Sequence, residues 1–178
     1  MKIKKTLKNA GLATAIAAAI GGSYLAGRGG GGERPSMTGQ FTVYKVSGEN
    51  VRQIAQSPNI MVAEGIRHTL QLISKAESTS VFDTAAYLGV GNSTTTSDTS
   101  MTGLQGDSTC LQNVDSITYG ADYIQYFKTF HTDDANFSWQ EFVLFNDSNA
   151  ICFNRATSAV GAKTTTDTFT LRLRITLD

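Results

Sequence analysis

The sequence is poor in charge and in the residues that disulfide and metal sites require. Charged residues make up 17% of the 178 residues, below the roughly 25% of a typical soluble domain. The formal net charge is zero, which excludes a uniformly basic nucleic-acid binder. Two cysteines are too few for a disulfide framework. The length suits one domain with a single core.

No motif of a catalytic, nucleotide-binding or metal-binding site is present. His68 and His131, the two histidines, belong to neither an HExxH helix nor a Cys/His zinc spacing. His131 with Asp133 and Asp134 has the composition of a turn between strands. The run GVG at 89–91 begins like a dinucleotide loop but lacks the third glycine, and no G-x-S-x-G elbow occurs. We therefore predict no catalytic residues, no metal ligands, no cofactor and no enzymatic activity.

The neutral total hides an uneven distribution of charge. Residues 1–35 contain six of the 15 basic residues and one of the 15 acidic residues. The remaining residues hold nine basic and fourteen acidic residues, so a leader of charge +5 precedes a body of charge −5. This asymmetry predicts a molecule whose two ends occupy different environments.

The composition of the leader, residues 1–27, predicts a basic and apolar anchor helix. After a cationic stretch from Lys2 to Lys8, no charge occurs between Ala10 and Gly27. Apolar side chains recur every four residues on one helix face, at Leu12, Ile16 and Ile20. Small residues recur at the same spacing, at Gly11, Ala15 and Ala19. Such spacing lets another helix approach closely.

Three interpretations of the leader compete. A secretory signal peptide needs a small-x-small cleavage site. Cleavage after Ala26 fits this poorly, because the large residue Tyr24 occupies one of the two small positions. A transmembrane helix needs about 20 strongly apolar residues, whereas this run of Ala and Gly is short and weakly hydrophobic. We favour the third interpretation, a helix buried against copies of itself or against a partner inside an assembly.

Glycine-rich sequence follows the leader and predicts a flexible linker over residues 28–36. No Gly-Lys-Ser/Thr follows the glycines, so the Walker phosphate loop is absent. The linker separates the leader from the body, which we predict to be one β-domain over residues 37–178.

The body is rich in Thr, Ser, Val and aromatic residues, with short apolar alternations broken by turn residues. This pattern predicts a mainly β fold, an antiparallel β-sandwich or jelly-roll-like domain. The clearest strand, at 167–178, turns its apolar residues to one face: Phe169, Leu171, Leu173, Ile175 and Leu177. Further strands are predicted at Gln40–Val46, Ala85–Val90, Ser116–Phe130, Phe137–Phe145 and Ala150–Phe153. Because 137–145 is apolar on both faces, we expect it in the centre of a sheet.

One helix is predicted within the body. Ser57 and Pro58 have the composition of an N-cap followed by the first helical residue. Apolar residues recurring through Ile73 then mark one buried face, which predicts helix to about Lys75. Gly65 costs about 1 kcal/mol relative to alanine inside a helix, so this helix depends on packing.

Four aromatic residues, Tyr119, Tyr123, Tyr126 and Trp139, are candidates for a binding surface. Tyr119 and Trp139 could contact a sugar or a protein, because the side chains of Tyr and Trp combine an apolar ring with a polar group and suit partly hydrated interfaces. Packing in the core or across strands is the favoured explanation for most of the four. Tyr123 and Tyr126 fall on opposite faces of a regular strand, so they cannot line one platform.

Two segments resemble a module of tailed-bacteriophage structural proteins. In the first, residues 59–106, a short helix precedes a stretch of the form ixxGxGxTxxxxxDTxL. The matching positions are Leu88, Gly89, Gly91, Thr94, Asp98, Thr99 and Leu104. Residues 100–103 stand between the Asp-Thr pair and Leu104, which departs from the usual form.

The second segment, residues 141–177, is similar to the end of the same module. An acidic and apolar strand is followed by the pair Asn154-Arg155, the turn Lys163-Thr164 and a closing alternating strand. The parts occur in the module's order, and the resemblance covers about residues 57–178. It implies virion structure, as in tail fibres, head fibres, minor tail proteins and decoration proteins, and it brings no catalytic residues.

We therefore expect a bacteriophage virion structural protein: a fibre, spike, minor tail or capsid decoration component. Its N-terminus would anchor it in the particle, with the β-domain exposed for assembly or host-surface contact. The expected partners are other virion proteins, copies of the chain in a homo-oligomer such as a trimer, and a glycan or protein of the host surface. Nucleic acid is expected only at the basic N-terminus, and a membrane is not favoured.

The alternative hypothesis is a membrane-tethered or exported bacterial surface β-domain that binds glycans or a protein partner. The stretch from Lys2 to Lys8 would then stay cytoplasmic by the positive-inside rule. A third hypothesis, an enzyme that acts on surface polysaccharide, lacks a recognisable pair of catalytic carboxylates.

The two cysteines, Cys110 and Cys152, leave two states open. They could form one disulfide, or stay apart as small buried residues. The virion hypothesis favours free thiols, because the bacterial cytosol in which such a protein folds is reducing.

Overall fold

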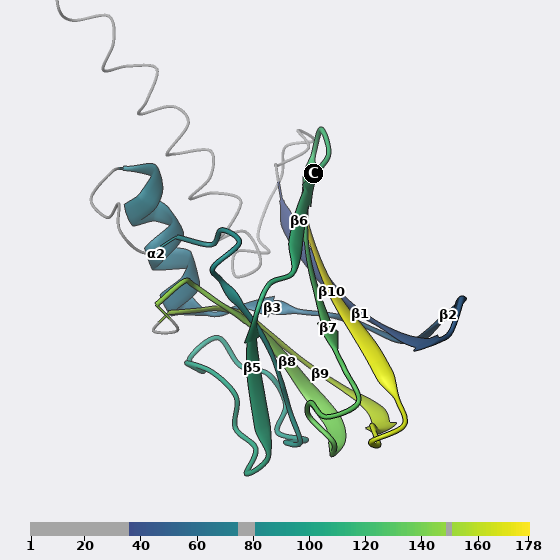
Figure 1. Cartoon of the computed structure of the whole chain (residues 1–178). Helices are drawn as coiled ribbons and strands as arrows, with labels where there is room; N and C mark the ends of the chain where they lie inside the picture. The colour runs from purple at the N-terminus through teal and green to yellow at the C-terminus, as the bar shows by residue number, and fades with distance from the viewer. Residues whose placement is uncertain (1–35, 75–80, 149–150) are drawn as a thin grey trace, which may run out of the picture.

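The computed structural model describes residues 36–74, 81–148 and 151–178, which form two facing antiparallel sheets and one short helix (Figure 1). In spatial order, the first sheet comprises β2 (Asn50–Pro58), β1 (Met37–Ser47), β10 (Thr168–Leu177), β7 (Tyr123–Phe130) and β6 (Ser116–Tyr119). The second comprises β3 (Ile60–Met61), β9 (Cys152–Ala162), β8 (Ser138–Phe145), β4 (Tyr87–Gly91) and β5 (Thr109–Asn113). The predicted mainly β, sandwich-type fold is confirmed. The predicted anchor helix and linker lie outside the described residues, except for Ser36, the last residue of the predicted linker.

The core lies between the sheets and is built from alternating side chains. In β10, Leu171 and Leu173 are fully buried and Phe169 nearly so, as the alternation predicted. Leu177, predicted to face the core, is 48% exposed because it is the last residue of the strand. Trp139 of β8 fills the centre, with its ring edge-on to neighbouring aromatic rings at centroid distances of 5.0 and 5.2 Å.

The predicted central strand is β8, which lies in the middle of the second sheet. Its inner face joins the sandwich core, whereas its outer face carries Val143 and Phe145 in a second apolar cluster. Helix α2 (Ala63–Ile73) and the loop between β4 and β5 supply the cover. This double burial explains why the strand is apolar on both faces.

Helix α2 begins later than predicted. Ser57 and Pro58 end β2, and the short strand β3 separates them from the helix. Proline is tolerated there because β2 is an edge strand and need not donate a ladder hydrogen bond. The Ser57 hydroxyl donates to the Thr157 carbonyl across the sandwich instead of capping a helix.

Other elements also differ from the predictions. The segment 116–130 is a hairpin, because the Gly120 amide donates to the Tyr123 carbonyl (2.9 Å) and turns the chain between β6 and β7. Strand β9 continues far beyond Phe153, to Ala162. The strands β2, β3 and β5 were not predicted. β2 and β5 consist of polar and half-exposed residues without clear alternation, and β3 lies in the segment predicted as helix.

Candidate functional site

A buried ion pair organises the outer face of the second sheet. Glu141 of β8 and Arg155 of β9 both have fully buried side chains. Arg155 Nη2 lies 2.7 Å and Nε 3.1 Å from Glu141 Oε2. Burying a charge costs several kcal/mol unless it is paired and hydrogen-bonded, so the rest of each group must also be satisfied.

The loop over residues 92–108 supplies the remaining partners. The amides of Gln105 and Gly106 donate to Glu141 at 2.8–3.1 Å. Arg155 Nη1 donates to the Thr95 carbonyl (2.8 Å) and to the Ser97 hydroxyl (3.1 Å). The ion pair therefore fastens both ends of this loop to the sheet.

Glycine is required where the loop leaves the sheet. A Cβ on Gly91 would overlap the carboxylate of Glu141, and one on Gly106 would overlap the side chain of Asn92. Both positions need the close approach that only glycine allows. Gly91 belongs to the first segment of the phage resemblance, and Glu141 to the second.

The same loop also caps α2. Val62 provides no side-chain cap, but the Ala63 amide donates to the Thr99 carbonyl (2.7 Å). Asp98 accepts hydrogen bonds from the hydroxyl (2.6 Å) and amide (2.8 Å) of Ser100, which hold its pKa below 3.8. The Asp-Thr pair of the first segment thus has a structural role, joining the loop to the helix start.

A second buried cation, Lys163, joins the β7–β8 and β9–β10 loops. It is 2% exposed, and its ammonium donates to the His131 carbonyl (2.5 Å) and to Asn136 Oδ1 (3.0 Å). Burial lowers its pKa. The neighbouring turn is closed by Asp134, which accepts from the His131 amide (2.9 Å). Among the described residues, no three His, Cys, Asp or Glu side chains are grouped so as to hold a metal ion.

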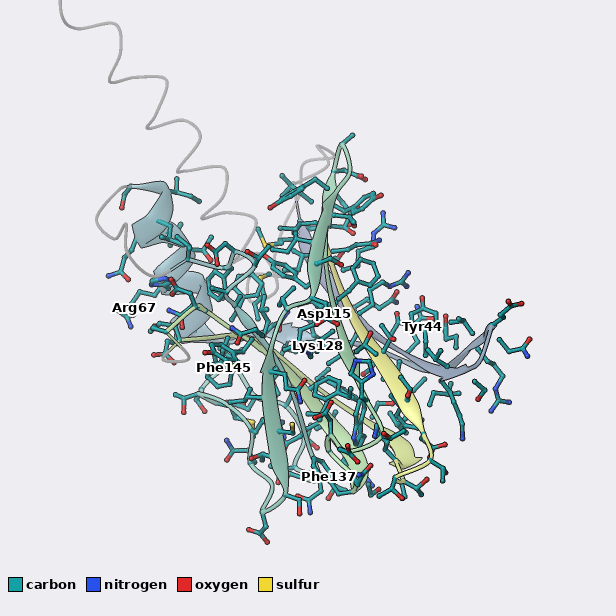
Figure 2. The ribbon with its side chains drawn as sticks, in the orientation of Figure 1. Tyr44, Arg67, Asp115, Lys128, Phe137 and Phe145 are labelled. Atoms are coloured by element: carbon teal, nitrogen blue, oxygen red, sulfur yellow. The ribbon has the colours of Figure 1, made fainter. Side chains whose placement is uncertain are left out.

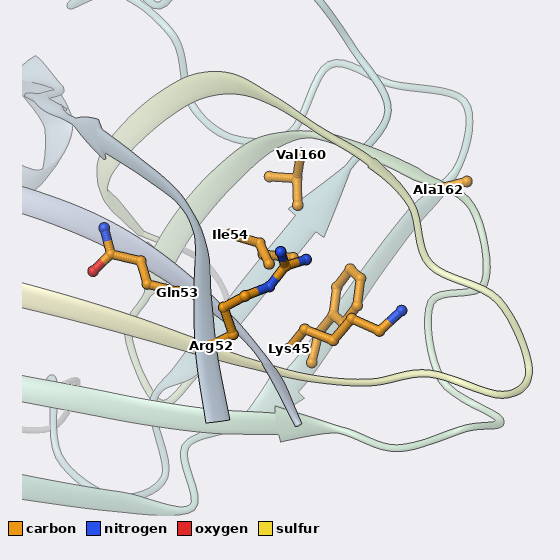
Figure 3. A pocket seen from close by; sticks show the side chains of 7 residues that line it. Lys45, Arg52, Gln53, Ile54, Val160 and Ala162 are labelled. Carbon is orange, nitrogen blue, oxygen red and sulfur yellow. The ribbon is translucent and has the colours of Figure 1, made fainter. Parts of the chain in front are cut away.

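A cleft lies between the β1–β2 hairpin and the end of β9 (Figure 3). Its volume is about 390 Å³, and its lining residues are Lys45, Arg52, Gln53, Ile54, Val160, Ala162 and Phe169. We call this the cationic cleft. The hairpin extends beyond the rest of the sandwich, which leaves the cleft open to solvent (Figure 1).

Hairpin register places both cations of the cleft together. The two-residue turn at Gly48 and Glu49 sets Lys45 directly opposite Arg52, and both point to the same side, whereas Gln53 points away (Figure 3). A β-bulge follows on β2, because Tyr44 pairs with Gln53 and Val43 with Ala55. Ile54 is the extra residue between them. The sequence signal for the site was therefore a Lys and an Arg at equal distances from a glycine turn.

Lys45 and Asp167 form the ion pair of the cleft rim. The Lys45 ammonium lies 2.5 Å from Asp167 Oδ1, and Asp167 Oδ2 accepts from the amide (3.0 Å) and hydroxyl (2.8 Å) of Thr164. The Lys45 hydrogen bond, followed by those of Thr164, lowers the pKa of Asp167 from 3.8 to about 2. Within the described part of the chain, Arg52 forms no ion pair with an acidic side chain.

The structure separates the aromatic candidates. Tyr119, at the end of β6, is 73% exposed and accessible for contact. Trp139 is fully buried, so its prediction as a surface contact is wrong: its large apolar ring packs between the sheets. Tyr126 faces inward and donates to the Phe82 carbonyl (2.9 Å), whereas Tyr123 lies on the outer face beneath Arg174. These two tyrosines occupy opposite faces, as predicted.

Cys110 and Cys152 are free thiols in the structure. Cys110 of β5 packs on the core side, whereas Cys152 of β9 lies in the outer apolar cluster. Three strand spacings, roughly 14 Å, separate β5 from β9. A disulfide needs Cα atoms within about 7 Å, so this fold does not allow a bridge between them. The predicted anchor residues Gly11, Leu12, Ala15, Ile16, Ala19 and Ile20 lie outside the described residues.

Comparison with known proteins gives no match to a family model, to a curated protein or to a solved structure. In the described part of the chain, no helix is long and apolar enough to cross a membrane.

Proposed function

We propose that the chain is a structural protein of a bacteriophage virion. The leader anchors it in the particle, and the sandwich stands outside as part of a fibre, spike, minor tail or capsid decoration. It functions together with other virion proteins and copies of itself. The sandwich is available for assembly or for contact with a glycan or protein of the host surface.

The observation that supports this proposal is the contact between the two segments that carry the phage resemblance. Gly91 and the 92–108 loop come from the first segment, and Glu141 and Arg155 from the second. They are far apart in the sequence, but the backbone of the loop contacts the buried Glu141–Arg155 pair. Of the matching positions, Gly91 lies close against Glu141, and the loop groups that bind the ion pair lie between or just after the other matching positions of the first segment.

The distribution of stabilising contacts also favours a structural role. The buried charges Glu141, Arg155 and Lys163 bind backbone groups of loops and so fix those loops in place. Fixed loops suit a component that must keep its shape in an assembly. We continue to predict no enzymatic activity, which an absence of released reducing ends from host polysaccharide would support.

The alternative proposal is a membrane-tethered or exported bacterial surface β-domain. The cationic cleft favours this alternative, because it is open to solvent. An open site suits a surface protein that recognises glycans or a protein partner. Under this alternative, the leader remains in the membrane and the body is exported.

Mass spectrometry of purified virions distinguishes the proposals. The virion proposal predicts peptides of the body and an intact peptide that begins near Met1. Absence of the chain from particles, together with its retention in host membranes after an alkaline wash, would overturn the virion proposal in favour of the tethered domain.

A further inference from the structure

Two like charges face each other across the β1–β2 ladder. Lys45 and Arg52 are directly paired residues on one face of the hairpin. Like charges in this position destabilise a strand pair. Among the described residues, only Asp167 forms an ion pair with either of them, and both of its oxygens already have partners. The cationic cleft therefore has one positive charge more than its carboxylate neutralises.

Among the described residues, no carboxylate forms an ion pair with Arg52, and Glu49, in the exposed turn of the same hairpin, pairs with neither cation. The five strands of the first sheet contain no Asp or Glu. Arg52 is exposed and its guanidinium has no ion-pair partner among the described residues. A planar guanidinium with free N–H groups matches a carboxylate, which it can bind through two parallel hydrogen bonds.

The volume of the cleft suits a small group. A volume of about 390 Å³ lies in the range of small-molecule sites, whereas a stable protein partner covers about 800 Å² of surface. Ile54 and Val160, both partly buried, form the apolar side of the cleft, whereas Phe169 lines it but is 3% exposed. A ring with an apolar face and a carboxylate at its edge fits this combination.

We propose that the cationic cleft binds an acidic sugar, with the sugar carboxylate on Arg52 and Lys45 and the ring against the apolar side. The sugar can be free or a unit of a polysaccharide. This inference goes beyond the proposed virion role and does not depend on it, because the cleft is formed within a single chain.

Calorimetric titration of the full chain tests the proposal with galacturonic acid, trigalacturonic acid and the corresponding neutral galactose compounds. We expect both acidic compounds to bind and the neutral ones to bind at least about tenfold more weakly, since a charge-assisted hydrogen bond contributes about 1.5–3 kcal/mol. Stronger binding of the trimer would indicate a polysaccharide, and equal binding a single sugar unit. Either result supports the proposal.

Two variants test the position of the site. Arg52→Gln should weaken binding about tenfold, and Arg52→Lys should restore part of the loss by returning the charge without the planar fork. Arg67→Gln is the matched control, since it removes the same charge from an exposed arginine on α2 (Figure 2). The midpoint temperature of thermal unfolding should be nearly the same for the three variants, because both arginines are exposed.

Several outcomes would overturn the proposal. These are no binding of the acidic sugars, equal binding of the neutral sugars, or an equal effect of Arg52→Gln and Arg67→Gln. A pentaglutamate peptide is titrated in parallel. If it binds more tightly than trigalacturonic acid, the ligand is an acidic protein segment and the sugar assignment is wrong. A failure here leaves the virion proposal untouched, since mass spectrometry of particles decides that separately.

Discussion

At the scale of single residues, stability depends on whether each buried charge has all its partners. Glu141→Gln would leave Arg155 buried with a neutral partner. We expect the free energy of unfolding to fall by about 3–5 kcal/mol, the usual cost of breaking a buried pair. Urea denaturation of the variant and the native sequence measures this.

The surface pair between Lys128 and Asp115 provides the control (Figure 2). Its atoms are 2.8 Å apart, but the Asp115 side chain is 43% exposed. Solvent screens such a pair, so Asp115→Asn should cost no more than about 1 kcal/mol. Equal losses for Glu141→Gln and Asp115→Asn would contradict the role assigned to the buried pair.

Asp167 should make stability depend on pH in the acidic range. Its pKa is lowered from 3.8 to about 2 by Lys45 and Thr164. Because the folded state holds the charged form, this contribution is complete above about pH 4 and is lost as the pH falls toward 2. The difference in unfolding free energy between the native sequence and Asp167→Asn should therefore be larger at neutral pH than near pH 2. A difference independent of pH would contradict the assignment.

Cys152 should be protected from alkylation in the folded protein. Burial, with a smaller effect of the nearby Glu64 charge, raises the pKa of its thiol from 9.0 to about 12. The thiolate is the reactive form, so iodoacetamide at pH 8 should modify the half-buried Cys110 first and Cys152 only after unfolding. Mass spectrometry of labelled peptides distinguishes the two. Rapid labelling of native Cys152 would refute the packing described for it.

Residue type alone did not reveal which side chains would be buried. Trp139 was predicted as a candidate contact but lies in the core, and the roles of Glu141 and Arg155 were not predicted. Tryptophan suits both a core and an interface. A buried ion pair depends on strand pairing and on a distant loop, which sequence spacing does not specify. The cationic cleft depends in the same way on the hairpin register.

At the scale of elements, helix α2 depends on a close contact with β9. A Cβ on Gly65 would lie about 2.5 Å from the backbone of Phe153. Gly65→Ala should therefore destabilise the protein, although alanine favours a helix by about 1 kcal/mol over glycine. Arg67→Ala, on the exposed side of the same helix, should change stability by no more than about 0.5 kcal/mol. Thermal unfolding measures both, and a stabilised Gly65→Ala variant would contradict this packing.

Strong periodicity explains which elements could be predicted. β10 and β8 were found because alternation or continuous apolar sequence fixes their position in a sheet. β2 was missed because it is a largely exposed edge strand, and its final Ser-Pro resembles a helix start. The sequence predicts one strand where the β6–β7 hairpin lies, since the turn contains a single glycine.

At the scale of the whole molecule, the two charged parts of the sequence lead to one central claim. The body is a β-sandwich whose acidic residues lie mostly outside the strands, and the leader is basic and apolar. We propose that the leader is held inside a virion and that the body stands outside. A reagent that cannot enter the particle should then modify the body but not the leader.

Surface labelling of intact, purified virions with an amine-reactive reagent tests this claim most directly. The proposal predicts modification of Lys45, whose side chain is 38% exposed, and protection of the lysines between Lys2 and Lys8 until the particles are dissociated. Equal labelling of the leader and the body in intact particles, or absence of the chain from them, would contradict it.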